Sequence, residues 1–79
     1  MQVNVKLFSV LRQYCPGYDP EKGVDLELPA GATVAQMLAR LSIPHEKAPV
    51  VACDGIILKA GDLLSEGGRL QVFQPVGGG

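Results

Sequence analysis

The C-terminal end of the chain holds the residues whose types and order best suit chemistry. Pro75 and Val76 follow a strand-like segment, and the sequence then ends in Gly77, Gly78 and Gly79. Extended residues advance about 3.3–3.6 Å each, so this segment would reach roughly 17 Å beyond a folded body. Glycine has no Cβ atom, and such an arm fits a channel too narrow for other residues. The pattern therefore predicts an unhindered Gly79 carboxylate presented inside another protein.

A carboxylate presented in this way can attack ATP and become an acyl-adenylate. A sulfur donor would convert that adenylate to a thiocarboxylate, whereas an amine would convert it to an amide. The plainer interpretation is an inert, disordered chain end, because termini are commonly disordered. The chemical interpretation is favoured because the glycines directly follow the last predicted strand.

Other reactive side chains are few and far apart. The one histidine, His45, lies in a polar segment, where a solvated loop side chain is the plainest interpretation. A metal site needs three or four converging ligands, which one histidine and two distant cysteines do not supply. Cys53 lies in an apolar run expected in the core, and Cys15 has only one nearby cation, Arg12. No metal site and no reactive thiol is therefore predicted.

Composition favours one small domain. The chain has 79 residues, 47% of them hydrophobic, and a domain of this size buries roughly 60% of its unfolded surface. Residues 1–40 carry four cations and four anions, and residues 41–79 carry three and four. Neither half has the basic surface of a nucleic-acid binder, and binding to an anionic membrane is disfavoured for the same reason. One small core also leaves little room for an enclosed active site.

The remaining signals favour a cytoplasmic setting. The apolar runs are far shorter than the about 20 residues that cross a bilayer. The alternating start of the chain has no signal-peptide pattern. Two cysteines are too few for a disulfide scaffold.

Periodicity predicts two strands near the start of the chain. Val3, Val5 and Leu7 alternate with polar residues, and residues 24–28 repeat this pattern up to a proline. Residues 9–14 are expected to form a short helical turn between them. The two strands are predicted to form an antiparallel hairpin with a long connection.

The clearest helix signal follows. Thr33 and Gln36 match a capping box, in which each side chain pairs with the other residue's backbone N–H. Apolar residues then recur at i, i+3, i+4 and i+7, which gives one stripe: Val34, Met37, Leu38 and Leu41. Pro44 stops the pattern, so we predict a helix over residues 34–42.

Three more strands complete the predicted fold. Residues 50–53 are a buried strand, Asp54-Gly55 is a tight turn, and residues 56–58 return as a short strand. Residues 70–74 are the last strand. One helix on a small mixed sheet is an α+β architecture, and this order describes a ubiquitin-like β-grasp over residues 1–74 with a flexible, extended tail over residues 75–79.

Together these features resemble the MoaD/ThiS family of sulfur carriers, β-grasp proteins that end in Gly-Gly. The likeness covers essentially the whole chain. It rests on three segments: VNVKLFSVLR at residues 3–12, LPAGATV at residues 28–34, and LSEGGRLQVFQPV at residues 64–76 before the glycines.

The resemblance implies a carrier rather than an enzyme, with catalysis on its partners and no bound cofactor. A ubiquitin-activating-enzyme-like adenylyltransferase of the MoeB/ThiF type would use ATP to adenylate Gly79. A cysteine desulfurase or rhodanese would donate sulfur, and a MoaE-like synthase large subunit or a thiazole synthase would receive it. The long connection over residues 9–23 and Pro75-Val76 favour the MoaD-like, molybdopterin branch over the ThiS-like, thiamine branch. A ubiquitin-like modifier joined to lysines through Gly79, or an interaction module with an inert tail, are the alternatives.

Strand parity predicts the partner surface. If the alternating apolar residues face the helix, Phe8 and Phe73 face outward from the first and last strands, which lie side by side in a β-grasp. Exposed aromatic patches often mark partner sites. The alternative is a bulge that turns Phe8 into the core. The resemblance to MoaD, whose outer sheet face docks its large subunit, favours the patch. Ile56, Ile57 or Leu58 would extend it, and parity does not choose among them in so short a strand.

Overall fold

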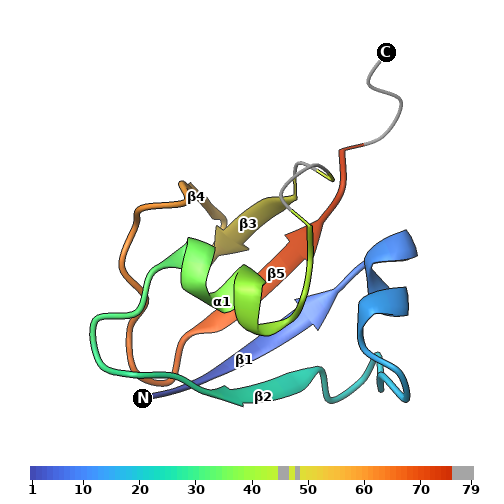
Figure 1. Ribbon diagram of the computed structural model, residues 1–79, viewed down its shortest axis with the longest axis horizontal. Coiled ribbons are helices and arrows are strands. Elements are labelled where there is room, and N and C mark those ends of the chain that lie inside the picture. The colour runs from blue at the N-terminus through green and yellow to red at the C-terminus, as the bar shows by residue number, and fades with distance from the viewer. Residues whose placement is uncertain (45–46, 48, 76–79) are drawn as a thin grey trace.

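The computed structural model describes residues 1–44, 47 and 49–75 and contains one mixed five-stranded sheet in the order β2-β1-β5-β3-β4, with a helix across one face (Figure 1). Strands β1 and β5 pair in parallel, and the other neighbours pair antiparallel. The elements are β1 Gln2–Leu7, the 3₁₀ helix η1 Ser9–Tyr14, β2 Val24–Glu27, α1 Val34–Arg40, β3 Val50–Cys53, β4 Ile56–Leu58 and β5 Arg69–Phe73. This confirms the α+β, β-grasp prediction, including the early hairpin.

The core lies between α1 and the sheet. The alternating residues of β1 predicted to face inward, Val3, Val5 and Leu7, are at most 1% exposed. Met37 from α1 and Val72 from β5 are fully buried against them. Each such side chain contributes about 1.5–3 kcal/mol through burial. The neighbouring strands β1 and β5 therefore supply a large part of the buried core.

The N-terminal cap of α1 forms as predicted. Thr33 Oγ1 accepts a hydrogen bond from the Gln36 N–H at 3.3 Å, and Gln36 Oε1 accepts one from the Thr33 N–H at 2.8 Å. The predicted stripe faces the sheet, although Leu38 is only half-buried.

The predicted end of the helix at residue 42 is wrong by two residues. Ser42 adopts a left-handed conformation with φ 60°, and its N–H donates to the Ala39 carbonyl. The next N–H, of Ile43, reaches back to the carbonyl of Leu38 at 3.0 Å. This is a Schellman ending, which closes a helix whatever the apolar spacing beyond it.

Strand ends differ from the predictions by one residue. β1 begins at Gln2 and β2 ends at Glu27, although the Leu28 N–H still donates to the Met1 carbonyl at 2.7 Å. β5 begins at Arg69 and ends at Phe73. Such shifts at fraying ends are ordinary.

The β3–β4 turn forms at Asp54-Gly55, as predicted. Both residues have positive φ, 52° and 81°, which is the pattern of a type I′ hairpin turn. Cys53, expected in the core, is only half-buried, because it ends β3 beside this exposed turn. Its Sγ atom lies 3.9 Å from Asp54 Oδ2.

In the part of the chain that the structure describes, no helix has the length and apolar character needed to cross a membrane.

Candidate functional site

The segment that leads to the terminal glycines follows a central strand. β5 pairs with β1 on one side and with β3 on the other, and it ends at Phe73. The exposed Pro75 follows, and the chain leads away from the sheet there (Figure 1). Proline has no N–H to donate to a neighbouring strand, so it ends the ladder. The predicted residues Val76, Gly77, Gly78 and Gly79, and also His45, lie outside the described residues.

Phe8 and Phe73 lie next to each other on the face of the sheet that points away from α1. In the parallel ladder Leu7 is opposite Val72, and the Phe8 N–H donates to the Val72 carbonyl at 3.1 Å. One step further along both strands brings the two aromatic residues together. Phe8 is 39% exposed and Phe73 is half-buried, whereas Leu7 fills the core. No bulge turns Phe8 inward.

The register extends this aromatic pair across the sheet. Val50 of β3 lies opposite Phe73, and Ala52 lies opposite both Gln71 and Ile57. Ile57 is 60% exposed. We call these outer-face residues the apolar strip: Phe8, Phe73, Val50, Ala52 and Ile57.

The register also decides which residues of β4 belong to the strip. Ile56 and Leu58 pair with Cys53 and Val51, so they point to the other face of the sheet. There Ile56 and Leu63 line an apolar groove of about 210 Å³. Sequence parity left this choice open because β4 has only three residues.

Tyr18 and Arg12, for which the sequence indicated no contact here, hold the chain in place beside Phe8. β2 begins only at Val24, opposite Val5, and so does not reach Leu7, whose N–H instead donates to the Tyr18 hydroxyl oxygen at 2.8 Å. Arg12 Nε donates to the Leu7 carbonyl at 3.0 Å, and its guanidinium carbon lies 5.8 Å from the centre of the Tyr18 ring. Ser9 then takes a left-handed φ of 53° as η1 begins. No sequence spacing signals this contact, because Tyr18 lies in an irregular connection.

The described residues contain no group of three or more histidine, cysteine and acidic side chains close enough to hold a metal ion. Cys15 and Cys53 are both half-buried and unpaired by a disulfide. What the described chain offers is therefore a partly exposed apolar face next to the end of β5, which leads toward the terminal glycines.

Comparison with known proteins gives the family. The ThiS family model matches residues 5–79, nearly the whole chain. The chain belongs to the ThiS family. It is thus one of the small ubiquitin-like proteins that act as sulfur carriers or modifiers.

Solved structures share the fold over the whole domain. A Pyrococcus furiosus protein described as a molybdopterin converting factor, subunit 1, is 27% identical, with a TM-score of 0.73 over 96% of this chain and 99% of that one. SAMP1 from Haloferax volcanii is 22% identical, with a TM-score of 0.72 over 100% of both chains. A structure of H. volcanii small archaeal modifier protein 1 is 21% identical, with a TM-score of 0.73 over 95% and 98%. No curated protein sequence matches this chain.

Proposed function

We propose that this member of the ThiS family is a sulfur carrier whose Gly79 carboxylate is adenylated and then converted to a thiocarboxylate. The observation that carries the proposal is the family match, which runs through the three terminal glycines to residue 79. The end of β5 at Phe73 supports it, because an arm that starts at a central strand has a firmly held root. The protein acts as a co-substrate, and the catalytic groups belong to its partners.

The chemistry balances with two partners. A carboxylate oxygen of Gly79 attacks the α-phosphorus of ATP, pyrophosphate leaves, and an acyl-adenylate forms on a MoeB/ThiF-type adenylyltransferase. The terminal sulfur of a cysteine persulfide, supplied by a desulfurase or rhodanese, displaces AMP and forms an acyl disulfide. A second thiol attacks the cysteine sulfur of that bond, which releases the thiocarboxylate and forms a disulfide.

The apolar strip supports a docking role for Phe8 and Phe73. An adenylyltransferase or synthase that receives the arm must also contact the face from which the arm departs. Aromatic side chains are frequent anchors of such interfaces. The strip includes Phe73, the last residue of β5, so one partner surface can cover the strip and receive the C-terminal segment.

We place the chain in the MoaD-like branch, as the small subunit of a molybdopterin synthase that delivers sulfur to a MoaE-like large subunit. The 27% identity to a molybdopterin converting factor and the long connection with η1 support this branch. Sulfur delivery to a thiazole synthase in thiamine synthesis is the alternative within the family, and mixing the thiocarboxylated protein with each synthase separates the two.

Intact-protein mass spectrometry tests the proposal. The protein is incubated with ATP, the adenylyltransferase and a persulfide donor, alongside a variant that lacks Gly79. We expect a mass gain equal to the exchange of one oxygen for one sulfur, and no gain in the variant. Omission of the sulfur donor is the control, since only an adenylate can form there.

Two results would contradict the carrier role. If the full-length protein gains no sulfur while the adenylyltransferase consumes ATP, the acyl-adenylate does not react with the persulfide. If Gly79 is recovered in isopeptide bonds to lysines of other proteins, the protein is a ubiquitin-like modifier.

A further inference from the structure

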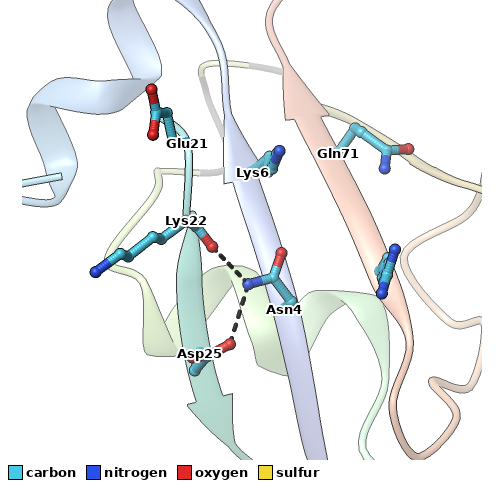
Figure 2. A pocket seen from close by; sticks show the side chains of 7 residues that line it. Asn4, Lys6, Glu21, Lys22, Asp25 and Gln71 are labelled. Carbon is cyan, nitrogen blue, oxygen red and sulfur yellow. Dashed lines mark hydrogen bonds between the residues drawn. The ribbon is translucent and has the colours of Figure 1, made fainter. Parts of the chain in front are cut away.

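A polar hollow lies on the outer face of the sheet, on the same strands as the apolar strip. Its volume is about 530 Å³, and Figure 2 shows side chains of β1, β2, β5 and the segment before β2 around it. The residues that line it are Asn4, Lys6, Glu21, Lys22, Asp25, Arg69 and Gln71. The proposed chemistry of the glycine arm uses none of them.

Two cations of the hollow lie diagonally across the β1–β5 ladder. Asn4 is opposite Arg69, and Lys6 is opposite Gln71. Diagonal neighbours are roughly 7–8 Å apart, and like charges in neighbouring positions of a sheet repel. Within residues 1–44, 47 and 49–75, the only carboxylate within 4.0 Å of a cationic group is that of Glu27, beside the Met1 amine. The described part of the domain thus leaves both cations without a counter-ion.

The acidic residues of the hollow are directed elsewhere. Asp25 Oδ1 accepts a hydrogen bond from Asn4 Nδ2 at 3.0 Å, and the same nitrogen donates to the Lys22 carbonyl at 2.8 Å (Figure 2). Both N–H groups of the Asn4 amide are therefore satisfied on the β2 side. Glu21 lies at the far end, near Lys22, whose side chain extends away from Asn4 (Figure 2).

The β5 side of the hollow is consequently rich in hydrogen-bond donors. Lys6 supplies an ammonium group, Arg69 a guanidinium fork, and Gln71 an amide on the same face. Such groups bind carboxylates through charge-assisted bonds, and an arginine fork can do so with two parallel bonds. We propose that Lys6 and Arg69 bind an acidic segment of the adenylyltransferase that activates Gly79. This inference rests on the proposed function.

The hollow continues the apolar strip directly. Lys6 precedes Phe8 by two positions and Gln71 precedes Phe73 by two, so all four point to the same face. Two residues along a strand span about 7 Å. A partner that covers the aromatic pair therefore needs its acidic segment only a short step further along the same ladder.

A protein segment suits this site better than a nucleic acid. Glu21 and Asp25 occupy the β2 side, and a phosphodiester chain, charged at every unit, would meet them. One or two carboxylates need contact only the β5 side. The chain as a whole has a net charge of −1, which also repels a polyanion.

Charge reversal tests the inference. The affinity of the adenylyltransferase for wild type, K6E/R69E and R40E/K59E is measured by calorimetry without ATP. Arg40 and Lys59 are exposed and lie outside the hollow, so R40E/K59E is a control of equal charge. We expect K6E/R69E to bind about tenfold more weakly at about 0.05 M salt, with a smaller deficit at about 0.5 M. The control should stay within about twofold of wild type.

The outcomes separate this inference from the proposed function. Suppose that wild type gains sulfur and binds the adenylyltransferase. If K6E/R69E then binds as tightly as wild type, or if R40E/K59E loses as much affinity as K6E/R69E, only the acidic-segment inference is overturned. If wild type neither binds nor gains sulfur, both proposals fail. Loss of single-stranded RNA binding in K6E/R69E, with adenylyltransferase affinity unchanged, would also overturn it. Thermal unfolding checks each variant, and K6Q/R69Q replaces K6E/R69E if that variant does not fold.

Discussion

Tyr18 provides the hydrogen bond that β2 cannot supply to the end of β1. The Leu7 N–H points to the edge of the sheet where β2 is missing, and Leu7 itself is fully buried. The Tyr18 hydroxyl accepts this hydrogen bond at 2.8 Å. A single phenol oxygen thus allows β1 to run to Leu7, two residues beyond Val5, its last residue paired with β2.

Removal of that oxygen should be costly. Because Y18F leaves the Leu7 N–H without its partner, we expect the free energy of unfolding to fall by about 1–3 kcal/mol. Chemical denaturation measures this change. Y14F is the matched control, because the half-buried Tyr14 hydroxyl makes no hydrogen bond with the described residues. An equal loss in both variants would show that the Leu7 contact is not the cause.

The Met1 amine makes stability depend on alkaline pH. Its hydrogen bond to Glu27 Oε2 at 2.9 Å raises the pKa of the amine, more than desolvation lowers it. A raised pKa stabilises the fold fully below the ordinary value of about 8, and this contribution is lost as pH rises through the raised value. The stability difference between wild type and E27Q should therefore be present at neutral pH and shrink above it. Denaturation curves across that range would refute this if the difference stayed constant or grew.

At the scale of elements, the connection from η1 to β2 packs tightly against β1. Gly23 has φ +70°, and a Cβ atom there would lie 2.7 Å from the Val5 carbonyl oxygen and 3.2 Å from Lys6 Cγ. Only glycine combines this backbone conformation with so close an approach. The position of β2 at the edge of the sheet, and the floor of the polar hollow, depend on it.

The variants G23A and G17A separate the cost of a left-handed backbone from the cost of a steric clash with β1. Gly17 also has a positive φ, 79°, but a Cβ atom there would have nothing within 4 Å. G17A should cost about 1–2 kcal/mol for the left-handed backbone alone. G23A adds the clash with β1, so we expect a clearly larger loss in the free energy of unfolding. Equal losses would mean that the loop shifts without cost.

At the scale of the whole molecule, the outer face of the sheet carries the proposed contacts. The apolar strip, the polar hollow and the root of the arm all lie on strands β1 and β5 or beside them. The opposite face is covered by α1 and holds the core. One partner approaching the uncovered face would reach all three features.

Truncation of Phe8, one member of the aromatic pair, tests this arrangement. F8A should weaken adenylyltransferase binding by about tenfold to a hundredfold, because aromatic anchors in interfaces are commonly worth 1–3 kcal/mol. L63A is the control, since Leu63 is 69% exposed but lies by the other groove. Leu63 is 69% exposed but Phe8 only 39%, so F8A also removes packed surface, and thermal unfolding must show that both variants are folded at the temperature of the binding measurement. Weaker binding of L63A than of F8A would move the docking face to β4.

Local patterns in the sequence determined most of the elements. The capping box at Thr33, the I′ turn at Asp54-Gly55 and the alternation in β1 each depend on residues a few positions apart. Side chains so close in sequence act on the same stretch of backbone in any fold. The terminal glycines were also visible directly, since the chemistry predicted for them depends on residue type alone.

Tertiary structure decided which distant residues share a face. The parallel pairing of β1 with β5 places Lys6 diagonally across from Arg69, and the β3–β4 register assigns Ile57 rather than Ile56 to the outer face. The contact of Tyr18 with Leu7 arises because β2 begins only at Val24, opposite Val5, and leaves Leu7 without a strand neighbour on that side. Strand pairing and register are set by packing of the whole core, and a shift of one residue would reverse every face. For that reason the sequence alone indicated an arm and an aromatic pair, whereas the polar hollow beside them became visible only in the assembled sheet.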